Sequence, residues 1–287
     1  MRIYILTDQE GVAGVVSSVD YAAPGARYYE TARRLLTLEV NAAIEGALAG
    51  GATEILVLDG HGHGSIDLEV MHPAARTIAG RPLAFPFLFD GSFDALMFVG
   101  QHAKANTSGG HLCHTGSMAQ EDLVLNGVSV GELGWYVQLA GYFGKPVILV
   151  TGDQAVCEEM RVLVPNTVTV AVKEGLDNGP ATGLTEDRNR LHNGAAIHIS
   201  PEVARTRIRN AAEHAVRSID TIPPWFLPPP YDLVSILRPE AQGGPHRVAL
   251  LESNDFLELG QLPRTHTLTL DDVLPHRRAV TFPSGDR

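Results

Sequence analysis

The sequence predicts an α/β fold with a mostly parallel sheet flanked by helices, followed by a smaller C-terminal α+β lobe. Short, continuous apolar runs recur along the first 175 residues, and segments with helical periodicity separate them. Such runs are typical of parallel strands, which are buried on both faces of the sheet. The second lobe is predicted because the pattern changes after a proline-rich stretch at 223–230, which we expect to be a rigid, extended linker.

The first sixty residues predict a βαβ unit. Residues 3–7 form an apolar strand, and residues 30–48 carry apolar side chains at helical spacing. Gly50 and Gly51 supply a signal for the end of that helix, and a second buried strand follows at 54–59. Strand, helix and strand in this order place two parallel strands side by side.

The remaining elements follow from the same criteria. Three further buried strands are predicted at 95–100, 146–151 and 167–172, and helices at 131–142, 153–163 and 200–218. Asp153 is expected to cap the second of these helices, and Pro201 suits the first turn of the third. Beyond the linker, strands are predicted at 231–237, 246–251 and 265–270, the last from its alternating pattern. We therefore predict a catalytic α/β domain over 1–222 and a smaller lobe over 231–287 that is a candidate for assembly contacts.

Composition narrows the functional classes. The formal net charge of −11 argues against a nucleic-acid partner, because such binders need a basic face. Cys113 and Cys157 are the only cysteines in the sequence, so any metal must be held mainly by nitrogen and oxygen ligands. No window approaches the ~18 apolar residues of a membrane span, and the first residues enter a strand at once. We expect a cytoplasmic protein with a small-molecule or peptide substrate and no membrane partner.

Carboxylates and histidines follow three of the predicted strands. Asp8 and Glu10 end the first strand, His61 ends the second and His102 ends the third, while Glu132 begins a helix. Ligands of open parallel sheets gather outside the carboxyl ends of the strands, so we expect these side chains to meet at one edge. Each has an ordinary alternative: the acids can cap a turn, a strand-end histidine is commonly structural, and a first-turn glutamate complements the helix dipole.

Taken together, three carboxylates and two imidazoles exceed the three protein ligands that one catalytic zinc ion usually takes. Two ions about 3.5–4 Å apart, with one bridging carboxylate, suit this set. The chemistry would be hydrolysis by a metal-activated water. The ligand mixture favours zinc, and manganese or cobalt are alternatives. His63 is an alternative ligand to His61, and Asp59 is a candidate hydrogen-bond partner of His61.

A second candidate group is His114, within the small, polar and glycine-rich segment 106–117. This composition is typical of a functional loop, where a histidine can move protons between attacking water and leaving amine. The alternative is an ordinary loop histidine. We disfavour a Cys113–His114 nucleophile, because adjacent residues rarely orient toward each other.

Five ordered motifs resemble those of the DppA-type D-aminopeptidases, a family of metallopeptidases. They are Thr-Asp-Gln-Glu-Gly at 7–11, Asp-Gly-His at 59–61, Gly-Gln-His-Ala at 100–103, Cys-His-Thr at 113–115 and Gly-Glu-Leu-Gly at 131–134. The resemblance covers roughly residues 1–175 and is weaker in the C-terminal lobe. It implies a site for two zinc ions at Asp8, Glu10, His61, His102 and Glu132, with Asp8 bridging, and places the family's catalytic histidine at His114.

The resemblance further implies release of N-terminal residues, typically D-alanine, from short peptides, and assembly into ring-shaped decamers whose sites face an inner channel. We predict a two-zinc aminopeptidase. A metal-dependent amidase or phosphoesterase, an L-specific aminopeptidase and a non-catalytic metal-binding protein remain the alternatives.

Overall fold

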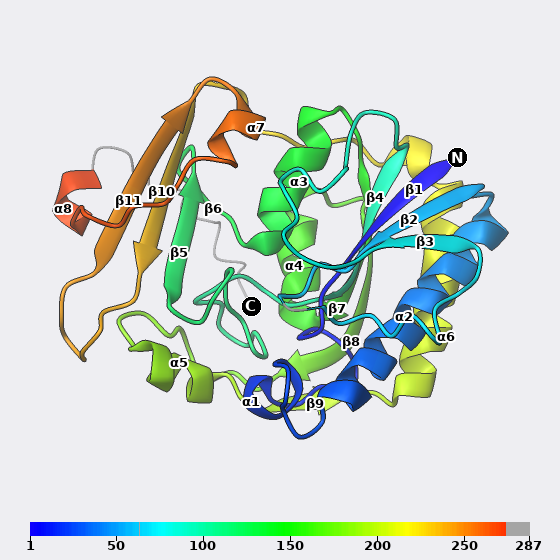
Figure 1. The fold of residues 1–287 in the computed structure, drawn as a ribbon, viewed down its shortest axis with the longest axis horizontal. Helices are drawn as coiled ribbons and strands as arrows, with labels where there is room; N and C mark the ends of the chain where they lie inside the picture. The colour runs from blue at the N-terminus through cyan, green and yellow to red at the C-terminus, as the bar shows by residue number, and fades with distance from the viewer. Residues whose placement is uncertain (63, 274–287) are drawn as a thin grey trace.

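The computed structural model describes residues 1–62 and 64–273 and contains two sheets (Figure 1). The larger sheet has the strand order β3-β2-β1-β4-β7-β8-β9. Its strands are β1 (Arg2–Thr7), β2 (Glu54–Leu58), β3 (Ala75–Ile78), β4 (Ala95–Gln101), β7 (Val147–Asp153), β8 (Val168–Gly175) and β9 (Ala196–His198). Neighbouring strands are parallel except β9, which pairs antiparallel with β8. The predicted mostly parallel α/β sheet is confirmed.

Helices cover both faces of this sheet (Figure 1). The long helices α2 (Tyr29–Gly50) and α6 (Pro201–Arg217) pack together on one face, and α3 (Glu132–Tyr142) and α4 (Gln154–Leu163) lie on the other. The predicted cap at Asp153 is confirmed, because its side chain accepts a hydrogen bond from the amide of Val156, and Pro201 lies in the first turn of α6 as predicted. Ser200, which was not predicted as a cap, accepts a hydrogen bond from the amide of Val203. Short helices α1 (Ser18–Tyr21) and α5 (Glu186–His192) and the 3-10 turn η1 (Ile219–Thr221) complete this part.

The smaller sheet is antiparallel and draws on two distant parts of the chain. Its order is β11-β10-β5-β6, with β5 (Gln120–Leu125), β6 (Val128–Ser129), β10 (Tyr231–Leu237) and β11 (Arg247–Ser253). The predicted strands at 231–237 and 246–251 correspond to β10 and β11, whereas β5 and β6 were not predicted. Because β10 pairs with β5, this sheet takes two strands from inside the range 1–222. The division into two domains stays a prediction.

The predicted strand at 265–270 is wrong. Within the described residues, this segment contributes a single bridge between Leu268 and Val248. The side chain of Asp272 accepts hydrogen bonds from the amide (2.8 Å) and the hydroxyl (2.7 Å) of Thr269. Both hydrogen bonds run from Thr269 to Asp272, and they fix the start of the short helix α8 (Leu270–Val273), where the extended backbone ends after one bridge.

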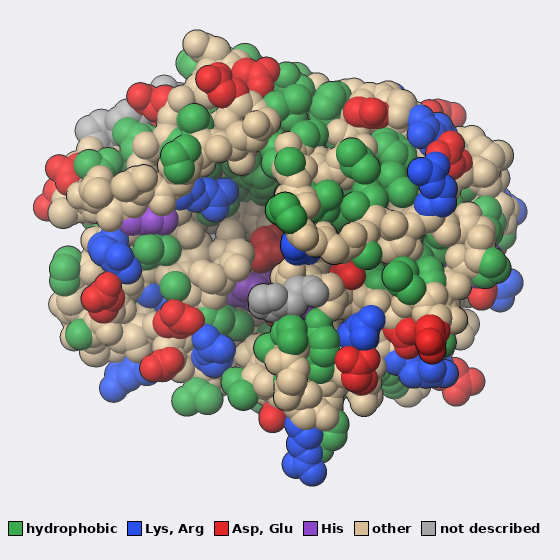
Figure 2. Space-filling model, viewed as in Figure 1, with side chains coloured by type: hydrophobic (Ala, Val, Ile, Leu, Met, Phe, Trp, Pro, Cys, Tyr) green, Lys and Arg blue, Asp and Glu red, His purple; other side chains and the backbone are tan. Residues whose placement is uncertain are grey.

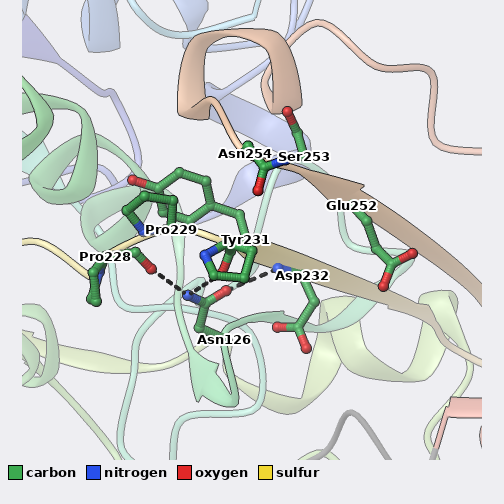
Figure 3. A pocket seen from close by; sticks show the side chains of 9 residues that line it. Asn126, Pro228, Pro229, Tyr231, Asp232, Glu252, Ser253 and Asn254 are labelled. Atoms are coloured by element: carbon green, nitrogen blue, oxygen red, sulfur yellow. Dashed lines mark hydrogen bonds between the residues drawn. The ribbon is translucent and has the colours of Figure 1, made fainter.

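The proline-rich linker at 223–230 is held between the smaller sheet and helix α3. Asn126 donates hydrogen bonds to the carbonyls of Pro228 (3.0 Å) and Pro230 (3.1 Å) and accepts one from the amide of Asp232, beside a surface cavity of about 540 Å³ (Figure 3). On the other side, the Gln138 amide exchanges two hydrogen bonds with the backbone of Leu227. The linker therefore fixes β10 against α3 rather than acting as a free hinge.

Within the part of the chain that the structure describes, no helix combines the length and the apolar character that a membrane crossing requires.

Candidate metal centre

The candidate site lies in a hollow between the two sheets, at the carboxyl ends of β1, β2 and β4. The hollow has a volume of about 590 Å³, and histidine and acidic side chains are visible in it (Figure 2). The loop after β1 is brought against the end of β4 by Gly11, whose amide donates to the carbonyl of Gly100 at 2.7 Å. Only glycine fits there, because a Cβ would lie 2.0 Å from the carbonyl oxygen of Gln101.

The first cluster contains Asp8, Glu10 and His61, whose candidate ligand atoms lie within 4.8 Å of one another. His61 Nδ1 is 2.8 Å from Glu10 Oε2 and 3.2 Å from Asp8 Oδ1. The other ring nitrogen, Nε2, lies 2.7 Å from the carbonyl of Ala22. A carbonyl only accepts, so Nε2 carries a proton, and Nδ1 is the ring nitrogen that faces the two acids.

The second cluster contains His102, His114 and Glu132, again within 4.8 Å. Glu132 Oε1 lies 3.5 Å from His102 Nε2 and 3.7 Å from His114 Nε2. The two imidazoles stack with ring centroids 3.9 Å apart. Their Nδ1 atoms each lie 2.9 Å from a backbone carbonyl, of Ala103 and Leu112, so both Nε2 lone pairs face the cluster.

Asp8 joins the two clusters. Its Oδ1 is 3.2 Å from His61 Nδ1, and its Oδ2 is 3.2 Å from His102 Nε2. Each carboxylate oxygen therefore faces a ring nitrogen of a different imidazole. This placement, one oxygen toward each cluster, is what a bridging ligand of two cations requires.

The electrostatics of the site require a positive charge between these groups. Burial by itself would lower the pKa of His61, but Glu10 and Asp8 outweigh it and raise that pKa to about 12. Burial would also lower the pKa of His102, but the charges of Glu132 and Asp8 outweigh burial and raise that pKa well above its usual range. For Asp8 the two effects act in the opposite directions. Burial would raise its pKa, yet His102 and His61 hold that pKa well below the usual range.

The residues present therefore fit a metal pair. Among the described residues, His102 Nε2 is a buried nitrogen without a hydrogen-bond partner. Imidazoles whose far nitrogens are fixed by backbone carbonyls, and carboxylates shared between them, are the usual surroundings of zinc. Asp8, Glu10, His61, His102 and Glu132 supply the predicted donor set, and His114 Nε2 is a sixth candidate donor that sequence reasoning treated only as catalytic.

Three other residues around the site have defined places. Asp59 does not support His61: its carboxylate accepts from the amide and hydroxyl of Ser65 and from the amide of Ile66, because the returning loop offers these donors. Cys113 is buried, and burial raises the pKa of its thiol, which disfavours a thiolate nucleophile. His63, the alternative ligand, lies outside the described residues.

Two buried charges beneath the site hold the loop that follows Asp8, and neither was predicted. The Lys173 ammonium, carried by β8, donates to the backbone carbonyls of Glu10 and Val15. The Glu39 carboxylate, carried by α2, accepts from the amide of Ala13 at 3.0 Å. A lysine within the apolar run of β8 was the available signal, since a buried ammonium needs specific partners.

Burial raises the pKa of Glu39 to about 7, although the Ala13 amide and the charge of Lys173 lower it in part. The folded chain thus keeps a proton that the unfolded chain loses near pH 4.5. We expect Glu39 to make the free energy of unfolding fall as pH rises from about 4.5 to 7, by about 3 kcal/mol. Glu39→Gln keeps the acceptor for Ala13 but cannot ionise, so its stability relative to wild type should increase over this interval.

Urea unfolding of the metal-loaded proteins at pH 5 and pH 8 measures this difference. Glu45→Gln, on the exposed side of the same helix, is the matched control. An equal pH dependence in Glu39→Gln and wild type would contradict a protonated Glu39 in the folded state.

Comparison with known proteins shows the family to which the chain belongs. The model of peptidase family M55, the D-aminopeptidases, matches residues 1–243. A D-aminopeptidase of Bacillus subtilis (strain 168) is 34% identical over 188 residues, which are 64% of this chain and 68% of that protein. The solved structure of the Zn-dependent D-aminopeptidase DppA from Bacillus subtilis, a self-compartmentalizing protease, matches with a TM-score of 0.78 at 27% identity. It covers 91% of this chain and 94% of that chain.

Proposed function

Because this chain belongs to the D-aminopeptidases of peptidase family M55, we propose that it releases the N-terminal residue of short peptides that begin with a D-amino acid. The observation that carries this proposal is the position of Asp8, with one oxygen 3.2 Å from a histidine nitrogen of each cluster. The Bacillus subtilis matches described above, one a D-aminopeptidase and one the structure of a Zn-dependent D-aminopeptidase, support the choice of substrate and metal.

The proposed centre holds two zinc ions. Asp8, Glu10 and His61 would hold one ion, and Asp8, His102 and Glu132 the other. Bound zinc supplies a Lewis acid that polarises the scissile carbonyl and makes a bound water acidic. The protein keeps the imidazoles in the ligating tautomer through the carbonyls of Ala22 and Ala103. The acidic side chains also favour the ammonium group of a peptide N-terminus over an acidic group.

His114 is proposed as the general acid-base. Its Nδ1 proton is committed to the carbonyl of Leu112, so the lone pair of Nε2 is free to take a proton from the attacking water. The same atom can then return the proton to the departing amine. Stacking on His102 holds the His114 ring beside the second cluster.

The proposed activity is tested with zinc-reconstituted protein and three substrates: D-Ala-D-Ala, L-Ala-L-Ala and a phosphodiester. We expect D-Ala-D-Ala to be cleaved with a kcat/KM at least about tenfold above that of the L-dipeptide, as stereochemical fit in a shaped pocket allows. A chelator should abolish turnover, and added zinc should restore it. Turnover that survives complete removal of metal, or cleavage of the phosphodiester alone, would refute the proposal.

We also propose that the chain forms a homo-oligomer, specifically a decamer, whose sites face an enclosed space. The support is that the solved relative is a self-compartmentalizing protease. Such an assembly admits short peptides and excludes folded proteins. A monomeric mass by light scattering at micromolar concentration would rule it out.

A further inference from the structure

The segment that follows α7 (Phe256–Leu259) forms one wall of the hollow above the candidate metal centre, where Gly260 and Arg264 line it beside Trp135. Aromatic packing fixes this segment, because the ring of Phe256 lies 4.6 Å from that of Trp135 and 5.9 Å from that of Phe85. Gly260 passes so close that a Cβ would lie 2.5 Å from the Phe85 ring. The wall is thus a fixed part of the hollow.

Arg264 places a cation in a hollow whose other lining charges are mostly acidic. Its guanidinium carbon lies 5.7 Å from the centroid of the Trp135 ring. Arg190, another arginine of the lining, is committed to Glu186 at 2.8 Å. For Arg264, by contrast, residues 1–62 and 64–273 provide no carboxylate at ion-pair distance.

A guanidinium above an indole ring is well suited to bind an anion. The ring fixes the plane of the guanidinium and leaves the N–H groups at its edge free. Those groups match the two oxygens of a carboxylate, in a charge-assisted, bidentate pair. A peptide substrate carries such a carboxylate at its C-terminus, and the neighbouring acids of the site disfavour a free anion without an attached ammonium.

Arg264 and most of the candidate metal ligands line the same hollow, which has a volume of about 590 Å³. Glu132 and Trp135 lie three residues apart on α3 and therefore share one face of that helix. The guanidinium above Trp135 lies over the same wall that carries Glu132. A short peptide whose N-terminal end is held at the metal centre extends its C-terminal part into the hollow that Arg264 lines.

We propose that Arg264 binds the C-terminal carboxylate of the substrate and thereby makes the enzyme selective for short peptides that end in a free acid. This inference rests on the proposed aminopeptidase function. It assigns a substrate-binding residue beyond residue 243, where the match to the family model ends.

The test compares D-Ala-D-Ala with D-Ala-D-alaninamide, which has the same scissile bond but no terminal carboxylate. Both are measured with wild type, Arg264→Gln, Arg264→Lys and Arg247→Gln. The last variant is the matched control, because Arg247 lies on β11, half-exposed, in an ion pair with Glu240. We expect wild type to prefer the free acid by about 10- to 100-fold in kcat/KM, the usual value of a charge-assisted pair.

In Arg264→Gln, kcat/KM for the free acid should fall by about 10- to 100-fold through KM, while the amide should change by less than about twofold. For the free acid, kcat/KM of Arg264→Lys should lie between the values of wild type and Arg264→Gln, and kcat/KM of Arg247→Gln should match wild type. Unchanged turnover of the amide also shows that the variant is folded. An equal loss on both substrates, or a wild type that does not distinguish them, would overturn the inference alone. A wild type that cleaves neither would overturn the proposed function and the inference with it.

Discussion

Asp8→Asn is expected to lower the affinity for both metal ions together and to reduce kcat by more than about 100-fold. Loss of one outer hydrogen-bond partner of a metal ligand already costs about 10- to 100-fold, and a ligand shared by two ions should cost more. Asn keeps the shape of Asp but offers one neutral oxygen, so it cannot face His61 and His102 with two charged oxygens. Zinc content after gentle purification and kcat with D-Ala-D-Ala are the two measurements.

Two further variants make this experiment specific. Asp220→Asn, at an exposed position in η1, should retain both ions and full activity. His61→Ala should leave partial occupancy, because the second cluster does not contain His61. If Asp8→Asn and His61→Ala lose metal equally and only in part, Asp8 is not the bridge.

His114→Ala is expected to lower kcat by about 10²- to 10⁴-fold while both zinc ions and the fold are retained. The methyl group cannot move a proton, but the five proposed ligands do not include His114. Binding of a competitive inhibitor should change little, since the carbonyl-binding groups remain. Steady-state kinetics, zinc analysis and circular dichroism on one preparation measure kcat, metal content and fold separately.

The controls for this variant address two different objections. His214→Ala removes an exposed histidine of α6 and should be silent. Cys113→Ser should be nearly silent if the buried thiol has no chemical role. Loss of a zinc ion from His114→Ala would show that Nε2, which lies 3.7 Å from Glu132, is a ligand rather than a proton carrier. Loss of turnover in Cys113→Ser alone would indicate thiol chemistry.

The sequence predicted those features of the fold that depend on local pattern. β1, β2, β4 and β7 are continuous apolar runs, and α6 carries Ser200 and Pro201 at its start, so both the elements and their ends could be recognised. The segment after α7 was predicted wrongly because Thr265 to Leu270 alternates like a strand, while the side chain of Asp272 accepts a hydrogen bond from the amide of Thr269 at the start of a helix there. β5 begins with three polar residues, and its distant partner β10 pairs with it over most of its length.

The same distinction applies to the site. Asp8, Glu10, His61 and His102 follow strands that could be recognised, so their meeting at one edge followed from the parallel sheet. Arg264 could not be anticipated, because it reaches the hollow through contacts among Phe85, Trp135 and Phe256 that are far apart in the sequence. Ligands positioned by backbone topology are predictable, whereas a wall positioned by side-chain packing is not.

The pairing of β5 with β10 has a consequence for biosynthesis. Residues 120–125 leave the ribosome more than a hundred residues before 231–237, a delay of roughly 5–20 s at ordinary rates of translation. During that time β5 has an open edge, which other chains can bind. Glu121 and Asp122 place negative charges on this edge and discourage such contacts. In the finished protein the Arg238 guanidinium lies 3.5 Å from the Glu121 carboxylate and His246 Nε2 lies 3.0 Å from it, so the charge that protects the nascent chain does not remain unpaired in the folded one.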